Sequence, residues 1–230
     1  MKSSLRLRHV IATIIFLGGI AYGLETHPDV YVPKKSSSQQ SSVTGDASKA
    51  LAMLTVKGRA PQTGYARTQF GNGWVVENGC DTRNIILRRD LVQVTMNGRC
   101  QVISGTLNDP YTGNSILFKR GAGTSDDVQI DHVVALSDAW QKGAQLLSYE
   151  MREQLANDPL ELLAVDGRVN QQKSDGDAAT WLPPDKAFRC QYVVRQVAVK
   201  KKYNLWITSA EKEAIARVLG ACLDQSLPIK

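Results

Sequence analysis

The dipeptide Asp131-His132 lies in an apolar stretch, "VQIDHVVAL", and is the strongest chemical signal in the chain. Of the three histidines, His9 and His27 lie in or next to the N-terminal segment, so only His132 falls inside the predicted folded domain. An imidazole with an unperturbed pKa of about 6.5 is largely neutral at neutral pH and can accept a proton. His132 is therefore the candidate general base of an enzyme.

Oxygen ligands and a lysine accompany this base. Asp131 and Asn170 offer hard oxygen donors of the kind that Mg²⁺ or Mn²⁺ takes in a water-rich site. Lys173 lies three residues after Asn170, on nearly the same helix face, and could hold a phosphate as a point charge. Phosphodiester hydrolysis needs a base for water, a cation for the developing charge, and stabilisation of the leaving oxygen. These residue types can supply all three.

Each of these side chains also has a structural interpretation. A single histidine in an apolar stretch is often a hydrogen-bonded core residue, and Asp131 could be a turn residue. Asn170 could serve only to cap a helix, and Lys173 could be a solvated surface lysine. Convergence on one site would separate the catalytic interpretation from the structural one.

The elements that must position these residues are two strands and a helix. Residues 127–134 and 160–165 are predicted strands, and a helix is predicted from about Val169 to Pro183-Pro184. Neighbouring residues of a strand point to opposite faces, so Asp131 and His132 can share a site only where the strand ends or bends. The expected fold class is α+β with a ββα-metal core.

Other elements are predicted on both sides of this core. A β-hairpin is expected over residues 91–105, because Asn97-Gly98 tolerates the positive φ of a tight turn, and a strand over residues 115–118. Predicted helices cover residues 46–57, 83–89, 136–147, 148–156, 185–201 and 209–223.

The N-terminus resembles a targeting segment. Residues 1–24 place basic side chains before an apolar run, which predicts a secretory signal peptide or, if uncleaved, a membrane anchor. Residues 25–45 are rich in serine and glutamine and predict a disordered linker, which leaves 46–230 for the folded domain. We therefore expect the protein to be extracellular, or anchored at the cell surface.

Four cysteines fit an oxidising compartment. Three pairings exist in principle. We expect Cys80 with Cys100 and Cys190 with Cys222, since each pair is nearest in sequence and lies within one supersecondary unit. The chain has no C-x-x-C motif, so a structural zinc site is not expected.

The charge balance favours a polyanionic partner. Lysine and arginine outnumber aspartate and glutamate by 28 to 22, giving a net charge of +6, although such a charge also serves solubility. Arg195 and Lys200 to Lys202 fall near a predicted helix end, where they would contact DNA phosphates or complement the helix dipole. No base-reading element is evident, so low sequence specificity is expected.

The segment "IDHVVAL", followed by "NDPLELLAVDGRVNQQKSDGDAATWLPP", resembles the HNH endonucleases of the His-Me finger group. It is most similar to their secreted bacterial branch, whose domain of unknown function is shared with some restriction enzymes. The resemblance includes "GYARTQFGNGW", "CDTRN" and "DPYTG" and spans roughly residues 60 to 223. It implies that Asp131 and Asn170 bind the metal and that His132 activates water.

One position departs from the family pattern. The middle asparagine of the motif normally braces the loop of the catalytic histidine, and Glu161 stands in its place. Asn157 could take over the bracing, or Glu161 could accept the same backbone hydrogen bonds. Arg83 and Arg168, together with Lys173, are the predicted substrate contacts, although Arg83 could equally form a structural salt bridge.

The prediction is a secreted endonuclease, a monomer that uses Mg²⁺ or Mn²⁺, needs no small-molecule cofactor and cuts DNA with low specificity. RNA is the alternative substrate. A non-catalytic surface module that binds polyanions on the same fold is the alternative from another class. A Ser-His-Asp hydrolase ranks third, because the motif G-x-S-x-G is absent.

Overall fold

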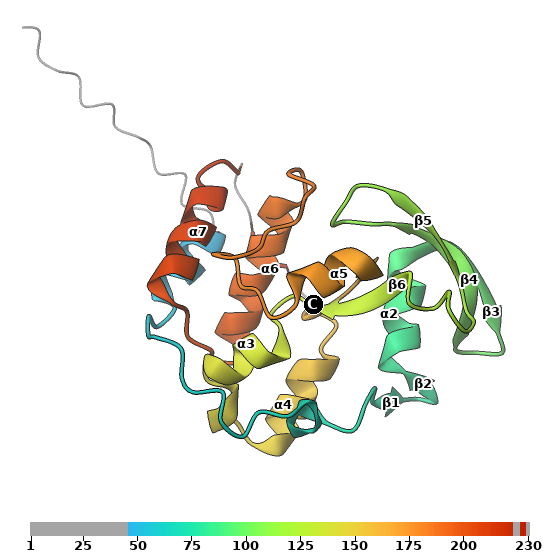
Figure 1. Ribbon diagram of the computed structural model, residues 1–230, viewed down its shortest axis with the longest axis horizontal. Coiled ribbons are helices and arrows are strands. Elements are labelled where there is room, and N and C mark those ends of the chain that lie inside the picture. The colour runs from blue at the N-terminus through green and yellow to red at the C-terminus, as the bar shows by residue number, and fades with distance from the viewer. Residues whose placement is uncertain (1–45, 223–225, 229–230) are drawn as a thin grey trace, which may run out of the picture. The chain divides into compact units, whose positions relative to one another are not determined.

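The computed structural model describes residues 46–222 and 226–228 (Figure 1). The predicted signal peptide or anchor, residues 1–24, and the predicted linker, residues 25–45, lie outside the described residues. Within the described part of the chain, no helix is long and apolar enough to cross a membrane.

A two-stranded antiparallel hairpin carries the Asp131-His132 dipeptide. Strand β6 (Val128–His132) pairs with β7 (Leu162–Asp166), and His132 lies opposite Leu162. Helix α5 (Gly167–Lys173) follows β7 directly. A Cβ atom at Gly167 would lie 1.9 Å from the carbonyl oxygen of Asp126, so only glycine permits this close approach between the helix start and the chain before β6. The order is strand, strand, helix, as predicted.

The connection between the two strands is helical. It contains α3 (Leu136–Gln141), the short 3₁₀ helix η2 (Ala144–Leu146) and α4 (Tyr149–Asn157). Ser148 caps α4 by accepting a hydrogen bond from the Met151 amide.

A three-stranded antiparallel sheet lies beside the hairpin, and one helix packs between the two. Its order is β3 (Leu91–Asn97), β4 (Gln101–Asn108), β5 (Ser115–Lys119), and Gly98 takes a φ of 62° in the predicted turn. Helix α2 (Thr82–Asp90) lies between this sheet and the hairpin (Figure 1). A smaller core fills this region with Ile86, Leu87, Val102, Leu107, Phe118, Val128, Ile130, Leu162 and Ala164.

The larger core lies on the other side of the hairpin, among helices. There α1 (Asp46–Met53), α6 (Arg189–Lys202) and α7 (Ser209–Leu219) pack together with α3. Trp140 is buried in this core and Trp181 packs against it.

Five helix boundaries were predicted wrongly. The helix predicted over residues 136–147 ends at Gln141, and the one predicted over 209–223 ends at Leu219. Helix α1 ends at Met53 instead of about residue 57, and α6 begins at Arg189 instead of 185. The helix predicted to continue to Pro183 ends at Lys173, because Ser174 adopts a φ of 50°. The following turn is closed by the Lys173 carbonyl, which accepts from Gly176.

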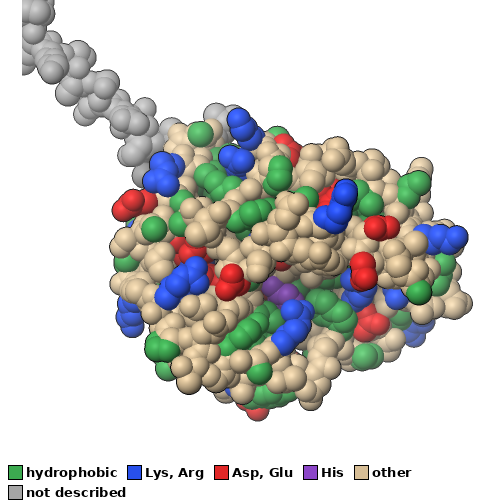
Figure 2. Space-filling model, viewed as in Figure 1, with side chains coloured by type: hydrophobic (Ala, Val, Ile, Leu, Met, Phe, Trp, Pro, Cys, Tyr) green, Lys and Arg blue, Asp and Glu red, His purple; other side chains and the backbone are tan. Residues whose placement is uncertain are grey.

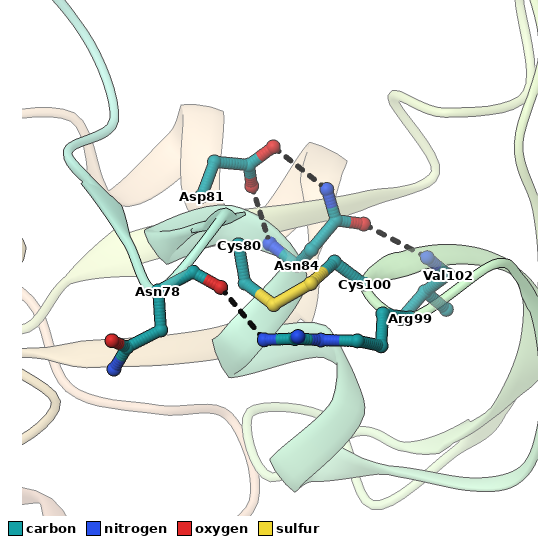
Figure 3. The surroundings of a disulfide bond; sticks show 7 residues. All are labelled: Asn78, Cys80, Asp81, Asn84, Arg99, Cys100 and Val102. Atoms are coloured by element: carbon teal, nitrogen blue, oxygen red, sulfur yellow. Dashed lines mark hydrogen bonds between the residues drawn. A yellow bond between two sulfur atoms is a disulfide. The ribbon is translucent and has the colours of Figure 1, made fainter.

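Both predicted disulfides are present. Cys80–Cys100 joins β2 (Cys80–Asp81), which pairs with β1 (Val76–Glu77), to the residue before β4. Figure 3 shows the polar bonds around it: Asp81 caps α2 through Asn84, and the Asn84 side chain accepts from the Val102 amide. Cys190–Cys222 links α6 to the segment after α7.

Candidate active site

Asp131 and His132 line a cavity of about 540 Å³. Its walls come from strand β6, helix α5, the start of α3 and a segment far away in sequence, residues 58–75, which we call the strap. In Figure 1 the strap runs past α3 and α4 toward β1. Figure 2 shows a histidine at the floor of a hollow, with a basic side chain close to it, and His132 is the sole histidine among the described residues.

The imidazole of His132 is held in one tautomer. Its Nε2 lies 2.9 Å from the carbonyl oxygen of Ala156, at the end of α4. A carbonyl can only accept, so Nε2 carries the hydrogen and Nδ1 keeps its lone pair. The Trp74 ring of the strap stacks on the imidazole, with centroids 5.9 Å apart and planes at 7°. Two neighbours therefore fix the ring and leave Nδ1 as the basic atom.

The surroundings of His132 keep it neutral. Burial lowers the pKa of His132 from its usual 6.5 to about 3, and the positive charges of Arg67 and Lys173 act in the same direction. The hydrogen bond to Ala156 opposes them, because it favours the charged ring. At neutral pH the ring is thus in the form that a general base needs.

Asp131 has a partner at each carboxylate oxygen. Lys173 Nζ donates to Oδ1 at 2.9 Å, and the Tyr111 hydroxyl donates to Oδ2. Burial raises the pKa of Asp131 above its usual range, although the charge of Lys173 and these hydrogen bonds pull it down. Burial also raises the pKa of Tyr111 well above its usual value, so its hydroxyl stays a donor. The carboxylate is fixed in orientation and borders the cavity.

Lys173 does not face the cavity. Its side chain is buried, and its ammonium group also donates to the His132 carbonyl at 2.8 Å. The predicted point charge for a phosphate is therefore placed inside the protein, where it joins α5 to the end of β6. This ammonium group positions the Asp131-His132 dipeptide, because both of its partners belong to it.

Asn170 borders the same cavity from α5. Its Nδ2 donates to Gln129 Oε1 at 2.9 Å, and Oδ1 accepts no hydrogen bond from the described residues. The amide oxygen is thus available as a ligand, as far as the described chain shows. The pairing with Gln129 was not predicted.

These donors fit a divalent ion that keeps most of its water. Asp131 supplies a carboxylate and Asn170 an amide oxygen, and both residues line the cavity. Each carboxylate oxygen of Asp131 accepts one hydrogen bond and so keeps a second lone pair for a metal ion. No group of three or more His, Cys, Asp or Glu side chains that could hold a metal occurs in the described residues. With one carboxylate and one amide from the protein, water would supply the remaining ligands of such an ion.

Glu161 braces the loop after His132. Its two carboxylate oxygens lie 3.2 Å from the Val134 amide, and its carbonyl accepts from the Val133 amide at 2.9 Å. The side chain is fully buried, and burial raises the pKa of Glu161 well above its usual value. Of the two predicted alternatives for the middle motif position, Glu161 makes the backbone bonds.

Asn157 has a different task. Its Oδ1 accepts from the Val75 amide at 2.9 Å, and its Nδ2 donates to the Glu153 carbonyl. It thereby ties the strap to α4 beside Trp74, the residue that stacks on His132.

The two predicted substrate-binding arginines differ in position. Arg83 lines the cavity, but its guanidinium is held by the carbonyls of Ser125 and Val128 at 3.1 and 3.0 Å. Arg168 is exposed at the start of α5 and does not line the cavity.

Three neighbours of the site had no assigned role in the sequence analysis: Tyr111, Arg67 and Trp74. All three fall within the stretches "DPYTG" and "GYARTQFGNGW", which carried the family resemblance without a chemical role. Only the resemblance could have indicated them, because their spacing from Asp131 has no pattern.

The chain is similar to a family of restriction-enzyme domains and to a secreted fungal protein. Residues 81–218, more than half of the chain, match the C-terminal domain of GmrSD restriction endonucleases. A protein of the fungus Arthroderma benhamiae, named "Uncharacterized secreted protein", is 38% identical over 178 residues, which cover 76% of this chain and 84% of the relative. The secreted relative and the two disulfides support the predicted extracellular location. The bacterial branch stays a prediction, since this relative is fungal.

Proposed function

Because the chain belongs to the family of GmrSD restriction endonuclease C-terminal domains, we propose that it is a secreted, metal-dependent nuclease that hydrolyses phosphodiester bonds. The proposal is consistent with the α+β fold and with the ββα order of β6, β7 and α5. Its substrate class is nucleic acid, with DNA favoured over RNA only by the family's name.

The observation that carries the proposal is the state of His132. The ring is neutral, Nε2 is occupied by the Ala156 carbonyl, and the ring lines the cavity beside a fixed carboxylate. A core histidine with no function would not need a cavity at its side. We propose that Nδ1 of His132 takes the proton of the attacking water.

Asp131 and Asn170 are the proposed ligands of Mg²⁺, or of Mn²⁺. When bound, the ion would offset negative charge on the substrate phosphate. Tyr111 and Lys173 hold Asp131 toward the cavity, and Glu161 holds the loop that follows His132. These three residues position the reacting groups and are not proposed to touch the substrate.

Plasmid cleavage by the oxidised protein tests the proposal. Wild type with Mg²⁺ or Mn²⁺ should cut DNA, EDTA should stop it, and His132→Ala should lower the rate by about 10²- to 10⁴-fold. A melting curve of the variant excludes unfolding as the cause. RNA in place of the plasmid tests the other substrate.

Two outcomes would reject this function. Undiminished cleavage by folded His132→Ala would remove His132 as the base. A folded, metal-supplied wild type that binds DNA equally well in EDTA and cuts neither DNA nor RNA would instead be a polyanion-binding module.

A further inference from the structure

Besides the proposed ion, a nucleic-acid substrate calls for protein cations that bind its phosphates, and the predicted ones are partly or wholly engaged elsewhere. Lys173 is buried against Asp131 and the His132 carbonyl. Arg83 has one guanidinium nitrogen, Nη2, bound to two backbone carbonyls, and Arg168 lies outside the cavity lining. Of the two arginines in that lining, Arg83 is thus tied to the backbone, and Arg67 is the better candidate.

Arg67 is placed where two hollows meet. It lines the main cavity of about 540 Å³ and a neighbouring one of about 130 Å³, and both are also lined by Trp74 and His132. Its side chain is exposed and forms no hydrogen bond or ion pair with any residue that the structure describes. The five N–H donors of a guanidinium are therefore open to a ligand from the cavity.

The backbone under Arg67 is held firmly, unlike its side chain. Arg67 opens the 3₁₀ helix η1 (Arg67–Phe70) of the strap. Arg152 donates to the Gln69 carbonyl at 2.7 Å and to the Gln69 side chain at 3.1 Å. Phe70 is buried, its ring packed edgewise against Tyr65 and Trp140 at 6.3 and 6.2 Å. The 3₁₀ turn that carries Arg67 is thus fixed to α4 and to the larger core.

Arg67 and His132 line the same two hollows, so the guanidinium and the imidazole border one space. The ring of Trp74, seven residues after Arg67 in the strap, stacks on that imidazole and holds the strap against it.

We infer that Arg67 is the residue that receives the phosphate of the nucleic-acid substrate beside His132, an inference that rests on the proposed nuclease function. A guanidinium matches two phosphate oxygens with two parallel N–H bonds, which a lysine cannot do. The strap therefore delivers a substrate-binding group to a catalytic core that lies some sixty residues later in the chain.

Binding and cleavage together test this assignment. In a His132→Ala background, which keeps DNA intact, the Kd for a duplex oligonucleotide is measured against salt concentration for Arg67→Ala, Arg67→Lys and Arg217→Ala. Arg217 is an exposed arginine on α7, outside both hollows, and its loss changes the net charge equally. The same three substitutions are made in the cleaving protein.

For Arg67→Ala we expect the Kd to rise about 10- to 100-fold and the slope of log Kd against log salt to fall by about 0.9, the loss of one phosphate contact. Arg67→Lys should keep the slope and lose part of the affinity, and Arg217→Ala should match its parent. In the cleaving protein, kcat/KM of Arg67→Ala should fall by a similar factor.

Equal effects of Arg67→Ala and Arg217→Ala would overturn the assignment, because net charge alone would then explain them. So would a wild-type slope and Kd in Arg67→Ala. Failure of the nuclease proposal is a separate result, seen as absence of cleavage by wild type with metal, and the binding slopes decide about Arg67 in either case.

Discussion

Two buried clusters of polar side chains in this molecule differ in how their charges are balanced. The first is the His132 site, formed by Asp131, His132 and Glu161 with their partners. The second, the Lys142 cluster, lies among α3, α6, α7 and the loop after α5. Three cations and three carboxylates form this cluster, and they are connected by ion pairs whose N–O distances are 3.4 Å or less. The members are Arg59, Lys142, Lys200, Asp138, Asp177 and Glu211.

Opposite charges prevail in the Lys142 cluster. Lys142 Nζ lies 2.6 to 2.7 Å from Asp138, Asp177 and Glu211. Burial would lower the pKa of Lys200, but Glu211 and Asp138 raise it above its usual value. Burial would raise the pKa of Asp177, but Lys142 and Arg59 hold it below its usual range. The opposite charges around Lys200 and Asp177 thus favour the charged form of each.

Burial prevails at the His132 site. It lowers the pKa of His132 and raises those of Asp131 and Glu161, so each shift favours the neutral form. The site also borders a cavity. Buried charge alone therefore does not mark an active site. Groups that lack full compensation and face a cavity are the better candidates for an active site, because they have capacity left for a substrate or a proton.

The largest expected effect is the loss of stability when a substitution disrupts the Lys142 cluster. Lys142→Met leaves three buried carboxylates without their central cation and should lower the free energy of unfolding by about 3–5 kcal/mol, as urea denaturation at pH 7 would measure. Lys49→Met, at an exposed lysine on α1, should change it by less than about 0.5 kcal/mol. The folded fraction of the Lys142→Met variant should cleave DNA at the wild-type rate. A change below about 1 kcal/mol would show that the cluster tolerates an unpaired charge.

The next effect concerns the brace at Glu161. Glu161→Ala leaves the Val134 amide without an acceptor and opens a cavity, which should cost about 3 kcal/mol of stability and, by loosening His132, about 10- to 100-fold in kcat. Glu161→Gln and Glu161→Asn keep an acceptor oxygen, so both should recover most of the activity. Equal losses in the Gln and Ala variants would mean that the carboxylate's charge matters, and not its hydrogen bonds.

The smallest effect is the acid dependence of stability. The unfolded imidazole binds a proton below about pH 6.5, whereas folded His132 does so only near its pKa of about 3. Its contribution to stability is complete above pH 6.5 and is lost as the pH falls toward 3. Between pH 7 and pH 5, wild type should lose about 2 kcal/mol more than His132→Gln in urea denaturation with EDTA. Parallel losses would show that folded His132 titrates normally.

The sequence by itself determined the local elements and the order of the core. Alternating apolar residues, the Asn97-Gly98 turn and the two apolar runs specified β3, β4, β6 and β7, because strands and turns follow from nearby side chains. Nearest-neighbour pairing of four cysteines specified both disulfides. The family resemblance placed Asp131, His132 and Asn170 at one site, and all three line one cavity.

Tertiary structure decided which charges are buried and which face the cavity. Lys173 and Lys200 look like surface lysines in the sequence, yet each is fully buried against carboxylates from distant segments. The helix after Asn170 ends early, and Asp177 reaches the Lys142 cluster instead of extending α5. Arg67 and Trp74 come to His132 through the strap. These contacts join residues that lie far apart in the chain, and a local sequence pattern does not show which distant segments will meet in the fold.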